Sequence, residues 1–250
     1  MAAAIRIDDA DGVRVVRWER DEALNAMSLD MWDATRDALD SAIGDGIRCI
    51  VLTGSGRAFN VGQDLAEMAD PRQADEARGY RGVMRALQEV PVPLIAAVNG
   101  RAVGFGVTVL PWCDFVLVSD AARFRVPFVS LGVTTEAASS VTLPEIMGPQ
   151  AAAHFVLTGD WLSAAEAVAT GLAWRAVAAE ELVDEAVALA TRLAEAPPES
   201  LRTTTGLLRH ERRARWAAAM DRENAAFARL AGSEENLAAI ERFFSRKGDR

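Results

Sequence analysis

Two short apolar runs, each released into a glycine-bearing loop, constrain the fold of this chain most strongly. CIVLTG at 49–54 leads into SGRAFNVGQDL, and PLIAAV at 93–98 leads into NGRAVGFG. Apolar runs of this length, each bounded by a turn signal, predict buried strands. Glycine lets a backbone N–H approach a ligand without an intervening Cβ. The two loops are therefore the expected place for the chemistry.

The regions before these runs alternate between strand and helix patterns. Segments 5–8 and 13–18 are rich in β-forming residues and flank Asp11-Gly12, which predicts a hairpin. Ser28 is a favourable N-cap, and a helix is expected over 29–43. Strands and helices thus alternate in the first half of the chain, which indicates the α/β class.

The alternation of strands and helices continues beyond residue 76 and then gives way to helices. A helix is expected over roughly 76–90, and strands over 115–120 and 122–126. From Ala137 onward the pattern is helical almost to the end. The stretch APPES near 195–200 indicates a hinge between a core and a helical C-terminal part.

Charge and cysteine usage exclude several functional classes. A formal net charge of −9 argues against general nucleic-acid binding, because phosphate binding requires a basic face. Cys49 and Cys113 lie far apart in apolar runs, so we expect buried thiols in a reducing compartment, with no disulfide and no metal-ligand spacing. The N-terminus shows no signal-peptide pattern, and no apolar stretch is long enough to span a membrane. A cytoplasmic protein is expected.

The glycine loops indicate one particular kind of site. A loop that opens a helix directs unpaired N–H groups outward, and two such groups, one from each loop, would form an oxyanion hole. The alternative is that both loops only turn the chain, which is the commoner role of such glycines. GRAVGFG lacks the G-x-G-x-x-G spacing of a dinucleotide site. There is no Ser/His/Asp arrangement, and His154 is expected to pack within an apolar helix.

Several motifs, in order along the chain, resemble the enoyl-CoA hydratase/isomerase family, or crotonase superfamily. They are ALNAM, GRAFNVGQDL, PLIAAVNGRAVGFG, CDFVLVSDAARFRVPFVSLG and the tail FFSRK. The resemblance implies a crotonase (ClpP-like) α/β fold, a spiral of repeated ββα units with a helical C-terminal trimerisation region. It also implies a core over 1–197 that holds the CoA-thioester site. Residues 198–250 would then form a region for oligomerisation and active-site cover, in a homotrimer or dimer of trimers.

The resemblance also assigns roles to residues at matching positions. The backbone N–H groups of Gln63 and Phe105 are implied to hold the thioester oxygen, and Asp64 is implied to brace the first loop. The other implied substrate-binding positions are Ala23, Leu24, Ala26, Arg57 and Phe59 near the adenine end of CoA, Lys247 near the 3′-phosphate, Gly62 and Gly104 in the glycine loops, and Phe128 in the apolar wall of the site. Coenzyme A is part of the substrate, and no other cofactor and no metal are implied.

The catalytic carboxylates depart from the hydratase pattern. Hydratases of the family carry two glutamates, and the matching positions here are Thr108 and Phe128. PFVSLGVTTEAASS instead resembles the peroxisomal-type 3,2-enoyl-CoA isomerase branch, in which one later glutamate, here Glu136, is the base. That resemblance implies a proton shuttle that converts 3-enoyl-CoA into 2-enoyl-CoA for fatty-acid β-oxidation.

Two sets of alternatives remain open at this stage. Glu136 is either that base or a first-turn acidic residue of the helix that follows it. The protein is an isomerase, a hydratase or related acyl-CoA enzyme with a displaced base, or a non-catalytic acyl-CoA-binding protein. A single carboxylate in an apolar setting, with a moderately raised pKa, fits the isomerase best.

Overall fold

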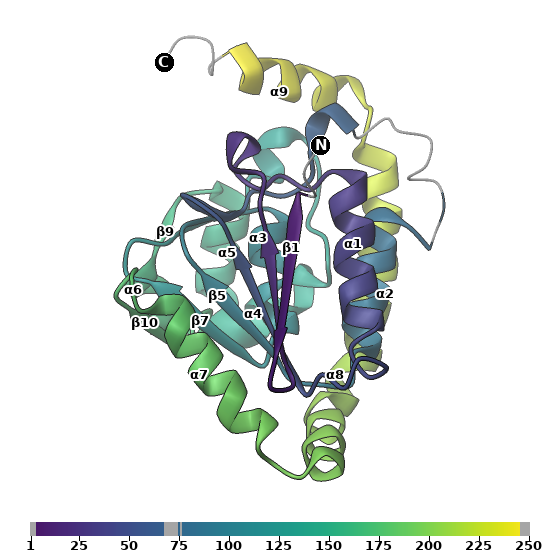
Figure 1. The fold of residues 1–250 in the computed structure, drawn as a ribbon. Helices are drawn as coiled ribbons and strands as arrows, with labels where there is room; N and C mark the ends of the chain where they lie inside the picture. The colour runs from purple at the N-terminus through teal and green to yellow at the C-terminus, as the bar shows by residue number, and fades with distance from the viewer. Residues whose placement is uncertain (1–3, 68–74, 76, 246–250) are drawn as a thin grey trace.

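A computed structural model describes residues 4–67, 75 and 77–245 of the chain. Within these residues the larger sheet has the strand order β1-β2-β3-β5-β7-β10 (Figure 1). The β1–β2 pair is antiparallel, and the remaining neighbours are parallel. The strand bounds are β1 Ile5–Ala10, β2 Val13–Trp18, β3 Cys49–Gly54, β5 Leu94–Val98, β7 Phe115–Ser119 and β10 Arg175–Val177. The predicted hairpin and both buried runs are confirmed.

A second, smaller sheet has the order β4-β6-β8-β9. Its bounds are β4 Ala58–Asn60, β6 Arg101–Val103, β8 Arg123–Arg125 and β9 Leu162–Ser163. Strands β3, β5 and β7 of the larger sheet are each followed in the chain by β4, β6 and β8 of the smaller one, and each pair then leads into a helix. This repeated ββα unit places corresponding loops one above another, so the two glycine loops meet.

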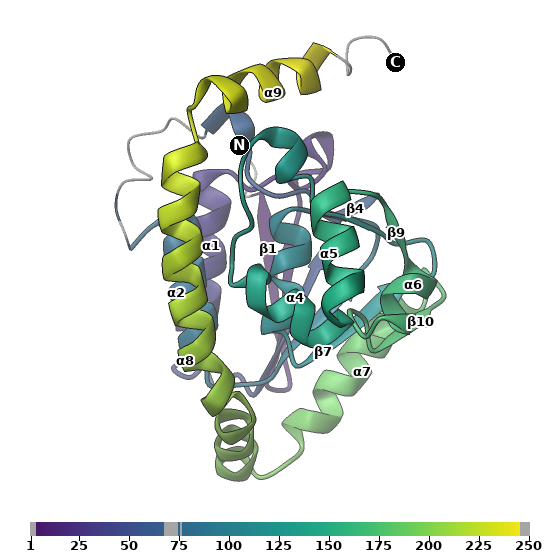
Figure 2. The same ribbon diagram turned by 180° about the vertical axis from the view of Figure 1, so that it is seen from behind.

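Helices cover both faces of the larger sheet (Figures 1 and 2). Their bounds are α1 Leu29–Asp40, α2 Gly79–Glu89, α3 Phe105–Thr108, α4 Ser139–Met147, α5 Pro149–Thr158, α6 Ala164–Ala169, α7 Leu182–Ala194, α8 Pro198–Leu230 and α9 Glu234–Ser245. Helix α7 packs on strands β2, β3, β5 and β7, and α8 packs against α4. Ser28 caps α1 by accepting the Met31 amide, as predicted.

The buried strands supply both sides of the core, which explains their continuous apolar sequence. In β3, Ile50 and Leu52 face the larger cluster, whereas Cys49 and Val51 face the cluster under α7. Successive side chains of a strand point to opposite faces, so both sets must be apolar. Each fully buried aliphatic side chain contributes about 1.5–3 kcal/mol. Both cysteines are buried free thiols, as expected.

Two expectations for the second half of the chain are wrong. Strands β9 and β10 interrupt the region predicted to be helical; they have two and three residues, too short for periodicity to reveal, and pairing with β8 and β7 forms them. The His154 side chain is 70% exposed, because α5 turns Ala152 and Phe155 inward instead.

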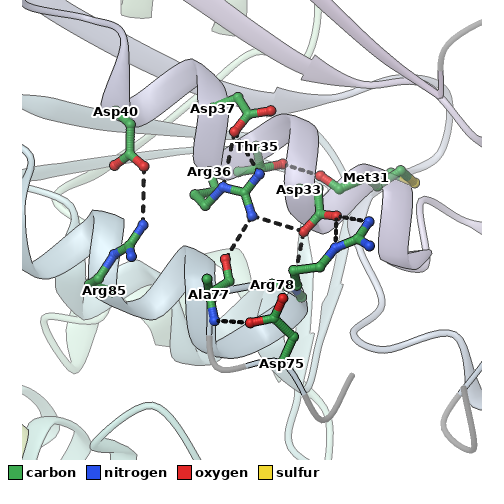
Figure 3. Close-up of polar contacts among 11 residues, drawn as sticks. Met31, Asp33, Thr35, Arg36, Asp37, Asp40, Asp75, Ala77, Arg78 and Arg85 are labelled. Carbon is green, nitrogen blue, oxygen red and sulfur yellow. Dashed lines mark hydrogen bonds and ion pairs between the residues drawn. The ribbon is translucent and has the colours of Figure 1, made fainter. Parts of the chain in front are cut away.

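Ion pairs fix the helices that surround the site. On α1, Asp33 accepts hydrogen bonds from the Arg78 side chain and from the Gly79 amide, which sets the start of α2 (Figure 3). On α8, the buried Arg209 pairs with Asp114 and donates to the carbonyls of Val90 and Val92. Because these partners lie on the core, α8 is held there through buried polar contacts as well as apolar packing.

Candidate functional site

The two glycine loops pack directly on each other. Gly62 has φ +89° and Gly104 has φ +56° with ψ −118°, a backbone that side-chain-bearing residues rarely adopt. A Cβ added at Gly62 would lie 3.3 Å from the Val103 carbonyl oxygen and 3.5 Å from the Phe105 amide nitrogen. The amides of Gln63 and Phe105 are therefore brought to the same place.

Hydrogen bonds around these two amides leave both N–H groups available. Met27 donates to the Gly62 carbonyl at 2.8 Å, and the Asp64 amide donates to the Met27 carbonyl at 3.0 Å. The Gln63 amide lies between these bonds, and the Phe105 amide begins α3. Within the described ranges neither N–H donates to a protein acceptor. Two such donors suit a developing negative charge on oxygen.

Glu136 lies between a short helical turn and α4, and its side chain is half-buried. The Thr108 hydroxyl donates to its Oε1 at 3.4 Å, the outer limit of a hydrogen bond. Thr108 ends α3, whose first residue is Phe105, so one short helix connects Glu136 to the amide pair. Burial, and then the charge of Glu223, raise the pKa of Glu136 to about 7, against a smaller lowering effect from Thr108.

The turn that follows Glu136 is strained and firmly held. Ala137 and Ala138 have φ of +56° and +64°, a left-handed conformation that costs a non-glycine residue about 1–2 kcal/mol. The Tyr80 hydroxyl accepts the Ala137 amide at 2.7 Å, and the Trp112 ring N–H donates to the Ala137 carbonyl at 3.0 Å. Strained backbone held by surrounding contacts is a common feature of functional sites.

Tyr80 reaches this turn because α2 is fixed at its start. The contacts of Asp33 with Arg78 (Figure 3) and with the Gly79 amide position the first turn of α2. Tyr80 is the next residue of that helix. Its ring packs edge-on against Trp32 and Phe105. Burial and the charge of Glu136 raise the pKa of Tyr80, so its phenol stays protonated at neutral pH.

The first-turn interpretation of Glu136 is not supported. The carboxylate at the start of α4 belongs to Glu223 of α8, which accepts the amides of Ala138 and Ser140, each at 2.7 Å. Helix α4 has no capping side chain of its own. The remote Glu223 therefore satisfies amides that a local cap would otherwise bind.

The ALNAM segment lies against the first glycine loop through two buried asparagines. The Asn25 side chain donates to the carbonyls of Ser55 and Ala58, and Asn60 donates to the Asn25 carbonyl. Asn25 has φ +59°, a conformation that asparagine tolerates better than most residues. Sequence reasoning missed Asn25 as the residue that organises this segment.

The remaining predicted substrate-binding residues lie in different settings. Ala23, Leu24 and Ala26 are half-buried, and Arg57 is exposed on the neighbouring loop. The Phe59 side chain is fully buried against Trp18 at a 5.0 Å ring separation, so it packs in the core, and its contact with CoA stays a prediction. Lys247 lies outside the described residues.

Asp64 and Phe128 border the same loops. The Asp64 carboxylate accepts hydrogen bonds from the Arg20 guanidinium at 2.6 Å and from the Ala66 amide at 2.9 Å. These contacts hold the first glycine loop in place. Phe128 is almost buried, and a Cβ at Gly104 would lie 4.0 Å from its ring. It thus places an apolar surface beside the second loop.

The described residues form neither a metal site nor a membrane-spanning helix. Their histidine, cysteine and carboxylate side chains form no group of three that could hold a metal ion. None of the helices described is long and apolar enough to cross a lipid bilayer.

The parallel α/β core, the two glycine loops and the half-buried Glu136 together define a class of protein, and the family comparison identifies that class. The enoyl-CoA hydratase/isomerase family model matches residues 8–248. The chain belongs to the enoyl-CoA hydratase/isomerase family, and its architecture is the crotonase fold.

The similar proteins include both enoyl-CoA isomerases and enoyl-CoA hydratases. Enoyl-CoA delta isomerase 2 of Homo sapiens is 32% identical over 96% of this chain, which spans only 63% of the human protein's length. A probable enoyl-CoA hydratase of Rhodobacter capsulatus is 34% identical over 77% of this chain and 76% of its own. An enoyl-CoA hydratase/isomerase structure from Pseudoalteromonas atlantica superposes with a TM-score of 0.91 at 33% identity, covering 97% of each chain.

Proposed function

We propose that this chain isomerises 3-enoyl-CoA thioesters to 2-enoyl-CoA thioesters, with Glu136 as the acid–base group. The observation that carries the proposal is one half-buried carboxylate with a pKa near 7, joined through Thr108 to the helix that presents the Phe105 amide. A base with a pKa near the working pH can both take up and return a proton. The enoyl-CoA delta isomerase among the relatives supports the same reaction.

In the proposed mechanism the thioester oxygen accepts hydrogen bonds from the amides of Gln63 and Phe105. This polarises the carbonyl and makes the α-proton more acidic. Glu136 removes that proton, and the negative charge of the resulting dienolate is stabilised by the same two amides. The protonated Glu136 then returns the proton to the γ-carbon, which moves the double bond into conjugation. The proton balance is closed, and no water is consumed.

The residues beside Glu136 favour isomerisation over hydration. Addition of water requires groups that position the water and move its protons. The two positions that match the hydratase glutamates hold Thr108, which is buried, and Phe128, which is apolar. Neither can act as an acid–base partner at neutral pH. Glu136 alone suits a shuttle between two carbons of one substrate.

The test is an ultraviolet assay of the purified chain with a medium-chain trans-3-enoyl-CoA. Isomerisation creates the conjugated thioester, which absorbs where the substrate does not. We expect turnover in the wild type and a loss of about 100- to 10,000-fold in Glu136→Gln. Glu180→Gln, at an exposed glutamate in a turn, is the matched control and should keep full activity.

A second substrate separates the rival activities. A hydratase would consume trans-2-enoyl-CoA and lose the conjugated absorbance, whereas the proposed isomerase would not. Binding of acyl-CoA with no turnover of either substrate would overturn the proposal in favour of a binding protein. Conversion of the 2-enoyl substrate alone would overturn it in favour of a hydratase.

The CoA portion and the assembly belong to the same proposal. The half-buried residues of the ALNAM segment and the exposed Arg57 form the surface proposed to meet the adenine end of CoA. We propose a homotrimer or a dimer of trimers, with the region from Pro198 contributing to contacts between subunits and to the cover of the site. Light scattering coupled to gel filtration measures the mass of the assembly, and a monomeric mass would refute the proposed oligomer.

We also propose that the protein acts in the cytoplasm and that its reaction belongs to fatty-acid β-oxidation.

A further inference from the structure

Glu223 is a buried charged residue that the proposed reaction does not use directly. It lies on α8, far along the chain from the glycine loops, and only 5% of its surface is exposed. A carboxylate is seldom buried to this extent unless it is paired or fully hydrogen-bonded. Its surroundings should therefore explain why it is there.

Both oxygens of Glu223 bind the segment that contains and follows Glu136. Oε2 accepts the Ala138 amide at 2.7 Å, and Oε1 accepts the Ser140 amide at 2.7 Å and the Thr135 hydroxyl at 3.4 Å. These partners lie on both sides of Glu136 in the sequence. One carboxylate thus spans the strained left-handed turn.

We propose that Glu223 is a positioning residue for the reaction: it acts through Glu136, by holding the strained turn that orients that side chain and by placing a second negative charge beside it. The inference rests on the proposed function. Glu223 does not touch the two oxyanion amides, so its effect should be on the proton transfer rather than on substrate binding.

Three side chains from different helices face Glu136. They are Thr108 from α3, the protonated phenol of Tyr80 from α2 and Glu223 from α8. Burial is the larger cause of the raised pKa of Glu136, and the like charge of Glu223 is the second. Removing that charge should therefore lower the pKa of Glu136 while leaving it above the ordinary value.

Two variants separate charge from geometry. Glu223→Gln keeps the volume, removes the charge and replaces one of the two accepting oxygens with an NH2 group that cannot accept the Ala138 or Ser140 amide. We expect the apparent pKa in the pH profile of kcat/KM to fall by about one unit. Glu223→Asp keeps the charge but shortens the side chain, and we expect a tenfold or larger loss of kcat at high pH with the apparent pKa and KM nearly unchanged. Glu211→Gln, an exposed glutamate on the same helix, is the control.

A measurement that needs no turnover distinguishes this inference from the proposed function. The carboxyl carbon of Glu136 can be titrated by carbon-13 NMR, with its signal assigned by its loss in Glu136→Gln. A lower midpoint in Glu223→Gln supports the inference even if the wild type converts no enoyl-CoA, a result that would overturn only the proposed function. An unchanged midpoint, or a Glu223→Asp variant with wild-type kcat, would overturn the inference. If the glutamine variant does not fold, the aspartate variant still decides the positioning role.

Discussion

The raised pKa of Glu136 predicts that replacing this residue will stabilise the protein at high pH. In the unfolded chain the carboxyl ionises near its ordinary pKa of 4.5, and in the folded chain near 7. Between these values the unfolded state holds fewer protons, so the free energy of unfolding falls as the pH rises. Below the lower value the effect is absent, and above the higher value it is complete.

The magnitude follows from the size of the shift. A rise from 4.5 to about 7, at roughly 1.4 kcal/mol per pKa unit, costs the wild type about 3 kcal/mol above pH 7. Glu136→Gln cannot ionise and does not pay this cost. We therefore expect the variant to gain stability relative to the wild type as the pH rises, by up to about 3 kcal/mol.

Urea denaturation at several pH values between 4.5 and 8.5 measures this difference. Both proteins must be compared at one protein concentration, because association of subunits would also change the apparent stability. Glu180→Gln, at an exposed site, should follow the wild type at every pH. A difference between Glu136→Gln and wild type that does not change with pH would refute the reasoning, because the carboxyl would then have the same pKa in both states.

Three further changes test other parts of the structure. Gly104→Ala should lower kcat about 100- to 1,000-fold in the ultraviolet assay, because the Gly104 backbone conformation suits only glycine and the Phe105 amide would move. The control is Gly148→Ala, which also has a positive φ, +79°, but has open space around it, and it should keep the activity. Equal losses of kcat in the two variants would contradict the argument. Tyr80→Phe removes the acceptor of a buried amide and should lower the free energy of unfolding by about 1–3 kcal/mol, so an unchanged urea midpoint would speak against that bond. Arg209→Met removes the closer of the two arginines that pair with Asp114, together with the hydrogen bonds to the Val90 and Val92 carbonyls, and should cost about 1–3 kcal/mol in the same experiment. A much smaller loss would show that α8 does not depend on this ion pair.

The burial of Glu136 and the strained turn after it both act against folding. Burial raises the pKa of the Glu136 carboxyl to near 7, which suits a base but lowers the stability of the folded state at higher pH. The left-handed conformation of Ala137 and Ala138 adds backbone strain. Tyr80, Trp112 and Glu223 offset these costs by binding the same turn. The site therefore depends on three elements that come from distant parts of the chain.

The sequence predicted the buried strands and the hairpin because strong local signals specify them. Runs such as CIVLTG are buried on both faces, and Asp11 and Gly12 both adopt the positive φ that the turn requires. Strands β9 and β10 were missed because two or three residues carry no periodic signal. Partner strands, rather than local propensity, make them strands.

By itself the sequence determined where two glycine loops follow buried strands, and its resemblance to the family drew attention to the carboxylate at 136 in place of the usual pair. Only the tertiary structure decided how those residues are held. Phe59 became part of the core, and Tyr80 and Glu223 joined the site from α2 and α8. The reason is physical. Strand burial and glycine conformation are local properties that short segments encode, whereas hydrogen bonds across 57 or 85 residues depend on the packing of whole helices.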